Sequence, residues 1–267
     1  MPQFSQITPA QLSRLMGTPD VPLILDVRVP EDLAADPRLI PTAQMLPHTD
    51  IAPMADPARR AVVVCNRGRK LSEGAAAVLR AQGMAAEVLE GGHLAWAGAG
   101  LPLVPQAALT GTALWVTRHR PKIDRIACPW LIRRFINPAA RFLFVAPSEV
   151  PAVASLFNAT PFDIEGIHFS HRGDGCTFDA MIAEFGLAHP ALTRLALVVR
   201  AADTDRHDLS PQAAGLLAIS VGLSRMYRDD LEQLEAGIAL YDALYRWARD
   251  GFDEGHDWPA TRPEAAQ

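Results

Sequence analysis

The chain has 267 residues, of which 49% are apolar and 21% charged, and a formal net charge of −5. This composition is typical of a soluble globular protein, and the acidic balance argues against general nucleic-acid binding. No apolar run approaches the roughly 20 residues of a membrane span, so we expect no membrane association. Met1–Phe4 begins no signal peptide, and the three scattered cysteines fit a reducing compartment, so we expect a cytoplasmic protein with room for two domains.

The first hundred residues alternate short helices with apolar strands. Thr8 is expected to cap a helix that ends at Gly17. The predicted strands are Pro22–Arg28, Ala61–Val64 and Ala85–Leu89, and a second helix is predicted over Ser72–Gln82. Buried strands that alternate with helices favour a parallel α/β sheet.

Cys65 closes the second of these strands and precedes a polar, cationic loop, Asn66-Arg67-Gly68-Arg69-Lys70, which leads into a helix. Helix N-termini and nearby cations lower the pKa of a thiol, and the thiolate is the nucleophile. Gly68 can adopt the positive φ that turns successive N–H groups inward. A buried-strand cysteine can instead be a small core residue, and each cation of the loop can be an ordinary solvated charge. The polar loop favours the nucleophile.

Three motifs in order resemble a rhodanese. Cys65–Lys70 matches the family's Cys-x-x-Gly-x-x loop, and Gly91–Trp96 matches its closing Gly-Gly … Trp segment. Asp26-Val27-Arg28 with Leu39–Ala43 matches the Asp-Val-Arg … Ile-Pro-Gly-Ala segment, although Thr42 stands where glycine is usual. Residues 1–104 therefore resemble a single-domain rhodanese, a sulfurtransferase whose fold is a parallel sheet flanked by helices.

The resemblance implies a reaction and a set of site residues. The Cys65 thiolate would take the outer sulfur of a small anionic donor such as thiosulfate, and the resulting persulfide would pass that sulfur to a thiophilic acceptor. The loop Asn66, Arg67, Gly68, Arg69 and Lys70 would bind the donor and the negative charge. Asp26 and Arg28 would support the loop, His93 would be a packing or surface residue, and no cofactor is required.

The amino-acid composition of the sequence changes after residue 104. Residues 105–111 are uncharged and are expected to be a linker, residues 112–250 a second domain, and the Pro- and Ala-rich residues 257–267 a disordered tail. Strands are predicted at 113–117, 141–145 and near Ile167. Helices are predicted at 124–135, 148–157, 177–185, 191–202, 211–224 and 228–249, the first with Arg125, Arg133 and Arg134 on its solvated face. We expect a helix-rich α/β or α+β fold.

Four segments of this second domain resemble the C-terminal domain of chromate-resistance protein B, a bacterial family. They are Trp115–Ile132, Pro161–Gly166, His171–Phe178 and Arg200–Thr204. The resemblance implies a role in resistance to chromate or oxidative stress. Full-length members carry a separate N-terminal segment credited with DNA-binding regulation, and this chain has the rhodanese-like segment in that place.

The second domain also contains residues that could ligate a metal. Asp124, His171, Cys176 and Asp203 are candidate ligands of a divalent cation. No pair has the spacing of a Cys-x-x-Cys or His-x-x-x-His site, so a hydrogen-bonded polar core with Cys128 and Cys176 as small buried residues stays open. A third alternative is an anion site near a helix N-terminus, formed by Arg118, His119 and Lys122.

These features lead to one functional hypothesis and one rival. The hypothesis is a sulfurtransferase linked to chromate or oxidative stress. The rival is a non-catalytic redox or oxyanion sensor, or a regulatory binding protein, in which Cys65 is a switch. The apolar positions of the helix at 226–247 fit the core or a dimer face, which leaves a homo-oligomer open.

Overall fold

The computed structural model describes residues 5–109 and 111–255. Its first domain is built on a five-stranded sheet with the order β1-β6-β5-β2-β4, in which every neighbouring pair is parallel. The strands are β1 (Gln6–Ile7), β2 (Leu23–Asp26), β4 (Gln44–Met45), β5 (Arg60–Val64) and β6 (Ala85–Leu89). The parallel α/β sheet expected from the sequence is therefore confirmed.

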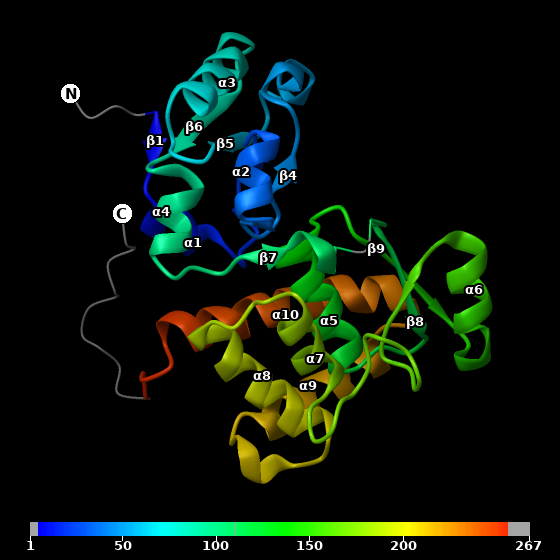
Figure 1. Ribbon diagram of the computed structural model, residues 1–267. Coiled ribbons are helices and arrows are strands. Elements are labelled where there is room, and N and C mark those ends of the chain that lie inside the picture. Colours follow the sequence, from blue (N-terminus) through cyan, green and yellow to red (C-terminus); the bar gives the residue numbers. More distant parts are fainter. Residues whose placement is uncertain (1–4, 110, 256–267) are drawn as a thin grey trace.

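Helices cover both faces of this sheet (Figure 1). They are α1 (Pro9–Leu15), α2 (Pro30–Ala35), α3 (Lys70–Ala81) and α4 (Gly92–Gly98), with short 3-10 helices at His48–Asp50 and Ala52–Met54. Alternate residues of a strand point to opposite faces. Accordingly, Val62 and Val64 pack with Leu12 of α1 and Trp96 of α4, whereas Val63 packs with residues of α3 such as Leu79.

The first residues of α1 and α3 differ in how their N–H groups are capped. Thr8 caps α1 as expected, and its side chain and that of Gln11 form a reciprocal capping box. Helix α3 begins at Lys70, two residues before the predicted start at Ser72. Its N-cap residue Arg69 makes no side-chain capping bond, which leaves the first N–H groups of the helix directed at the preceding loop.

The first residues of the predicted linker belong to the first domain. β7 (Val104–Pro105) pairs antiparallel with β3 (Arg38–Leu39), and a 3-10 helix follows at Gln106–Ala108. Residue 110 and the predicted tail at 257–267 lie outside the described residues.

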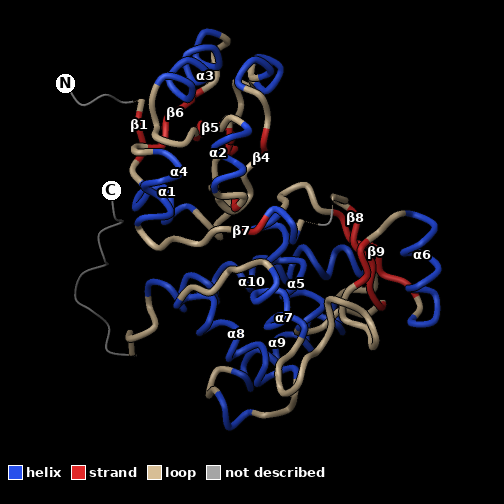
Figure 2. Tube along the Cα trace, viewed as in Figure 1, coloured by secondary structure: helices blue, strands red, loops and turns tan. Residues whose placement is uncertain are grey.

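The second domain has a small parallel sheet with the order β10-β8-β9 at one side of a helical body (Figure 2). Its strands are β8 (Leu114–Arg118), β9 (Arg141–Val145) and β10 (Thr160–Pro161). The strand predicted near Ile167 is wrong: the strand lies earlier, and Phe169 makes only an isolated bridge with Phe162. Positive φ values at Asp163 and Gly166 turn the chain between these two positions.

The helices of the second domain agree with the predicted spans to within a few residues. They are α5 (Asp124–Leu131), which continues as a π-helix at Ile132–Ile136, α6 (Val150–Phe157) after a 3-10 turn at Pro147–Glu149, α7 (Thr177–Glu184), α8 (Pro190–Asp203), a 3-10 turn at His207–Leu209, α9 (Ala213–Met226) and α10 (Asp230–Asp250). The helix-rich second fold is thus confirmed. Among the described residues, no helix combines the length and the apolar character needed to span a bilayer.

The predicted solvated face of α5 and its π-helical extension is wrong. The side chains of Arg125, Arg133 and Arg134 are only 19%, 19% and 18% exposed. Each lies against a carboxylate supplied by a distant segment: Arg125 against Asp163, Arg133 against Glu235, and Arg134 against Asp242. The helical pattern of the sequence does not reveal these tertiary ion pairs, which hold the three cations against other segments of the second domain.

The two domains share a packed boundary. Gly17, with φ +71°, lies so close to the second domain that an added Cβ would be 2.5 Å from the Tyr245 ring and 2.6 Å from the Phe135 ring. The N–H of Thr42 donates to the Phe135 carbonyl at 3.0 Å. Thr42 itself has φ +65°, the left-handed conformation that favours the glycine usual at this position of the motif.

Candidate functional site

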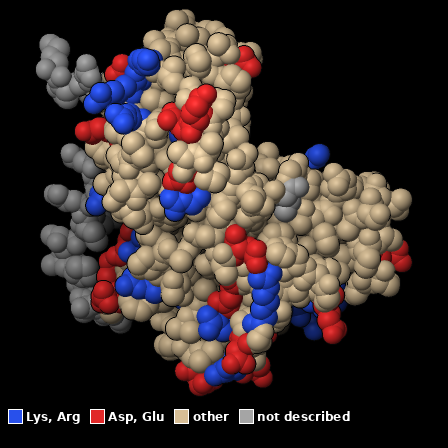
Figure 3. Space-filling view, in the orientation of Figure 1, with Lys and Arg blue, Asp and Glu red and all other residues tan. Residues whose placement is uncertain are grey.

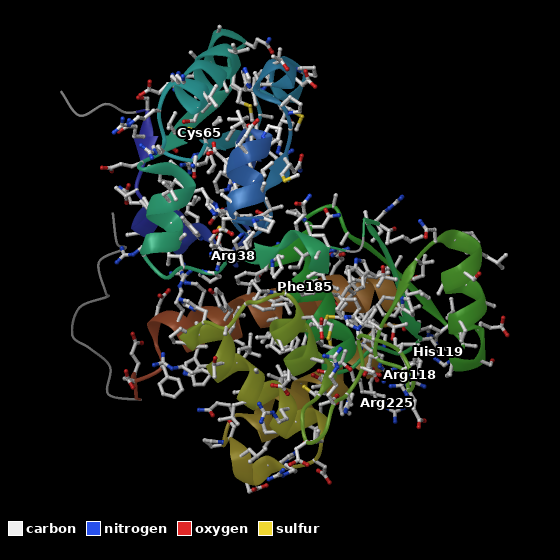
Figure 4. The ribbon with its side chains drawn as sticks, in the orientation of Figure 1. Arg38, Cys65, Arg118, His119, Phe185 and Arg225 are labelled. Carbon is white, nitrogen blue, oxygen red and sulfur yellow. The ribbon has the colours of Figure 1, made fainter. Side chains whose placement is uncertain are left out.

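The Cys65 side chain lies at the carboxyl end of β5, where the chain turns toward α3 (Figure 4). Its Sγ accepts a hydrogen bond from the Arg69 N–H at 3.3 Å and lies 3.1 Å from Ser72 Oγ. Ser72 Oγ is also 3.0 Å from the Arg69 carbonyl. The single hydroxyl proton of Ser72 can therefore point to the carbonyl while Cys65 is a thiol, and to Sγ when it is a thiolate.

These contacts favour the ionised form of Cys65. Burial by itself would raise the pKa of the thiol, but hydrogen bonds from the Ser72 side chain and from the main chain at Arg69, Ser72 and Arg67 outweigh it. The pKa of Cys65 consequently lies below that of an ordinary thiol. A buried thiolate held by main-chain amides is a nucleophile prepared before substrate arrives.

Glycine is required by the packing of this loop. Gly68 has φ +64°, and a Cβ there would be 2.4 Å from the Leu89 carbonyl oxygen. Gly92, at the start of α4, is equally close, because its Cβ would be 2.2 Å from the Cys65 carbonyl oxygen. The loop and the start of α4 therefore touch through backbone alone, which fixes the ring of amides around Sγ.

The loop cations lie outside this hydrogen-bond set. Arg67, Arg69 and Lys70 are exposed, and hydrogen bonds rather than their charges are the main causes of the lowered pKa of Cys65. Asn66 is half-buried and donates to Asp32 of α2 at 2.7 Å, so its side chain ties the loop to a neighbouring helix. Donor binding by the side chains of the loop stays a prediction.

Asp26 and Arg28 form a buried ion pair with nitrogen and oxygen 2.8 Å apart. The Arg28 guanidinium also donates to the carbonyls of Asp36 and Arg38, on the segment that enters β3. His93 is buried, its Nε2 is 3.1 Å from Asp36 Oδ2, and its main-chain N–H donates to the Cys65 carbonyl. Burial is the main cause that lowers the pKa of His93, which fits a packing role.

A second polar site lies in the second domain, where carboxylates from three separate segments surround one imidazole. His171 Nε2 is 3.4 Å from Asp124 Oδ2, 3.4 Å from Asp163 Oδ1 and 3.2 Å from Asp203 Oδ2. Asp124 and Asp163 are buried, whereas the His171 side chain is 44% exposed. We call Asp124, Asp163, His171 and Asp203 the carboxylate–histidine cluster.

The structure thus brings together three of the four residues considered as metal ligands from the sequence, and adds Asp163. The Cys176 thiol donates to Asp179 at 3.3 Å and also contacts Asp124, and burial followed by the nearby Asp124 charge raises its pKa far above the ordinary value. Asp163 was missed because its position depends on the pairing of β10 with β8. The available signal was an aspartate two residues after a short strand.

The carboxylates of the cluster influence one another's protonation. Hydrogen bonds that His171 donates to Asp124 and Asp163 raise its pKa to about 10. Burial, followed by the charges of Asp124 and Asp163, raises the pKa of Asp203 to about 7. Burial is also the main cause that raises the pKa of Asp124, whereas bonds from His171, Thr177 and Arg118 outweigh burial and lower the pKa of Asp163. The cluster is a concentration of negative charge with a cationic imidazole at its centre.

The residues considered as an anion site lie beside this cluster. Arg118 Nη2 is 3.1 Å from Asp163 Oδ2, so its charge is already partnered. His119 is exposed and lies next to Arg118 (Figure 4), and Lys122 is half-buried. On the face seen in Figure 3, basic and acidic side chains are interspersed, with no broad surface of one sign. Anion binding by Arg118, His119 and Lys122 stays a prediction.

Parallel sheet, cysteine loop and glycine contacts together define the first domain as rhodanese-like, and the rhodanese-like domain family matches residues 8–99. The ChrB C-terminal domain family matches residues 115–248. The chain therefore belongs to the ChrB C-terminal domain family and carries a rhodanese-like domain ahead of that domain.

Three individual proteins are similar to parts of this chain. Protein ChrB of Cupriavidus metallidurans is 37% identical over 133 residues, which are 49% of this chain and 39% of that protein. The match thus spans well under two thirds of that relative. Among solved structures, a rhodanese-related protein from Thermoplasma volcanium is 24% identical, covering 38% of this chain and 99% of its own, with a TM-score of 0.34. A thiosulfate sulfurtransferase from Pseudomonas aeruginosa is 27% identical, covering 38% of this chain and 19% of its own, with a TM-score of 0.31.

Proposed function

We propose that the protein is a sulfurtransferase of the thiosulfate type that works through a persulfide on Cys65. The observation that supports this most is the Cys65 Sγ, held by the Arg69 N–H at 3.3 Å and by Ser72 Oγ at 3.1 Å, with a lowered pKa despite burial. A structural core cysteine has no need of such contacts, and burial alone would have raised its pKa.

The reaction has two steps. The Cys65 thiolate attacks the outer sulfur of thiosulfate; an Sγ–S bond forms, the S–S bond of thiosulfate breaks, and sulfite leaves with the electron pair. A thiophilic acceptor such as cyanide then attacks the terminal sulfur of the persulfide, and the electron pair returns to Sγ. The main-chain amides of Asn66–Lys70 would stabilise the persulfide anion between the steps. These steps require no metal or cofactor, and the exposed Arg67, Arg69 and Lys70 would attract the anionic donor.

We further propose that this activity serves resistance to chromate or oxidative stress, through the ChrB-type domain. The fusion of both domains in one chain supports the link, as does the packed boundary of Gly17 against Tyr245 and Phe135. The same boundary favours one rival, in which the protein is a sensor and the state of Cys65 alters how the second domain binds a partner.

Turnover separates the enzyme from the sensor. The purified full-length protein is incubated with thiosulfate and cyanide, and thiocyanate is measured. Many thiocyanate molecules for each protein chain are expected. Mass spectrometry of protein treated with thiosulfate alone should find one added sulfur atom on Cys65. A persulfide that forms but is not passed to cyanide or to a thiol acceptor would favour the sensor instead.

A further inference from the structure

We propose that Asp124, Asp163, His171 and Asp203 form a binding site for a divalent cation of the Mn²⁺ type in the second domain. This site is separate from the Cys65 chemistry: Cys65 lies in the first domain beside α3, whereas Arg118, which marks the cluster, lies in the second domain (Figure 4).

The fold places the cluster where parallel α/β sheets bind ligands, at the carboxyl edge of the strands. The three strands of this sheet are parallel, so their carboxyl ends meet at one edge. Asp163 follows β10, and Asp124 opens α5, the helix that follows β8. The carboxyl end of α8 supplies Asp203 to the same point, and the loop before α7 supplies His171.

Within the cluster, three carboxylates share one imidazole as their donor, and Thr177 adds donors to the oxygens of Asp124 and Asp163 that face it. His171 Nε2 lies within 3.4 Å of oxygens from three carboxylates, although one ring nitrogen carries a single N–H. The facing atoms of Asp124, Asp163 and His171 all lie within 4.8 Å of one another, which is the spacing of ligands around a common ion. A cation between the oxygens and Nε2 would displace the Nε2 proton to solvent and bind all four side chains together.

An independent observation comes from β8. Thr117 is fully buried, and its Oγ1 makes no hydrogen bond among the described residues. It stands on the same face of β8 as Trp115, toward the core that contains α5, because side chains alternate along a strand. Thr117 lies one residue before the carboxyl end of β8, at the edge of the sheet from which the chain continues to Asp124. A cation with bound water would give this hydroxyl a partner.

Neighbouring groups already orient the carboxylates. Thr177 donates its hydroxyl to Asp163 Oδ1 at 2.9 Å and its N–H to Asp124 Oδ2 at 2.6 Å. Arg118 and Arg125 both bind the other oxygen of Asp163, Oδ2, and leave Oδ1 facing His171. Outer contacts of this kind orient the ligands of protein metal sites.

The donor set selects the cation. Three carboxylates and one imidazole suit a borderline-hard first-row ion such as Mn²⁺, whereas thiolate-seeking ions need sulfur. The nearby Cys176 thiol donates to Asp179, which Arg200 holds with two hydrogen bonds of 2.9 and 2.8 Å, and it contacts the cluster through Asp124. The half-exposed His171 lies on a loop at the surface, and this gives the ion a way in.

Calorimetric titration with Mn²⁺ tests the site in full-length protein that has been treated with a chelator and then freed of it. One Mn²⁺ should bind to each chain. His171→Ala and Asp203→Asn should each weaken binding at least about tenfold. The matched controls are His168→Ala, on the same loop, and Asp205→Asn, two residues along, with side chains 62% and 96% exposed. Both controls should bind Mn²⁺ as the unchanged protein does.

The outcomes are distinct. Failure of the unchanged protein to bind Mn²⁺, or equal binding by the cluster variants and the controls, overturns the proposal, and the imidazolium of His171 is then the cation that neutralises the cluster. Binding of Zn²⁺ without Mn²⁺ overturns the choice of cation. Circular dichroism shows whether each variant is folded, and Asp203→Asn keeps the shape of the side chain if His171→Ala disturbs its loop.

Discussion

The two polar sites of this molecule favour charges of opposite sign. In the first domain, main-chain N–H groups and Ser72 surround one sulfur and favour its negative charge. In the second, the side chains of Asp124, Asp163 and Asp203 surround one imidazole and favour its positive charge. The amide site is built from one continuous loop, and the carboxylate site from segments up to 79 positions apart, Asp124 and Asp203. A loop site can be recognised in the sequence, whereas an assembled site depends on the fold.

The largest expected effect comes from removing the sulfur itself. Cys65→Ser should reduce the rate of thiocyanate formation by about 1000-fold or more, because the hydroxyl is a poor nucleophile toward sulfur and cannot form a persulfide. Binding of Mn²⁺ in the second domain should not change, which would sharpen the separation of the two sites. Cys128→Ala is the control, since Cys128 is buried in the second domain. Sulfur transfer retained by the Cys65→Ser variant would falsify the assignment.

A substitution at Gly68 tests whether sulfur transfer needs the main-chain contacts of the Cys65 loop. In Gly68→Ala, the new Cβ meets the Leu89 carbonyl oxygen at 2.4 Å in a conformation with φ +64°, so the loop must move. We expect the rate of sulfur transfer to fall about 100-fold, in line with the loss of oriented main-chain donors. Thiocyanate formation is the measurement.

Gly74→Ala is the matched control for this change. Gly74 lies within α3, its φ is not positive, and an added Cβ has no neighbour within 4 Å. This substitution should leave transfer unchanged and stabilise the helix by up to about 1 kcal/mol. Equal transfer rates for the two alanine variants would show that the loop does not depend on its backbone contacts.

A substitution at Asp124, which is only 1% exposed, removes a carboxylate that holds the second site together. In Asp124→Ala, the N–H groups of Thr177 and Phe178 at the start of α7 lose their acceptor. We expect the free energy of unfolding to fall by about 2–4 kcal/mol, measured by denaturant titration. Asp205→Asn, at an exposed carboxylate whose positive φ of 56° asparagine also tolerates, should change it by less than about 0.5 kcal/mol. Equal stability of both variants would contradict a structural role of Asp124.

How much could be predicted from the sequence follows from the same contrast. The three predicted strands of the first domain, the Cys65 loop and the capping by Thr8 depend on residues close in the chain, and the structure places them as expected, whereas the two-residue strands β1 and β4 were not predicted. Asp163 was missed, and the strand near Ile167 was placed wrongly, because both depend on how β10 pairs with β8. The partners of Arg125, Arg133 and Arg134 likewise come from segments far along the chain.

The smallest expected effect concerns Ser72, because the loss of a single side-chain hydrogen bond costs about 1 kcal/mol. In Ser72→Ala, the thiolate of Cys65 loses the hydroxyl 3.1 Å from Sγ but keeps the Arg69 N–H, so the pKa of the thiol should rise. A group with a lowered pKa is ionised at a lower pH. At a pH below the pKa of both proteins, the variant should therefore react with iodoacetamide about fivefold more slowly, and the two rates should converge as the pH rises.

Ser13→Ala is the matched control, since Ser13 and Ser72 each donate a hydroxyl to the carbonyl three residues earlier, at Ala10 and Arg69. Only Ser72 also touches sulfur. If both variants are alkylated at the rate of the unchanged protein, the hydroxyl does not hold the thiolate, and the amides alone must do so. If Ser72→Ala alone is slower, the first site combines a side chain with the backbone, and the contrast with the carboxylate–histidine cluster becomes one of degree.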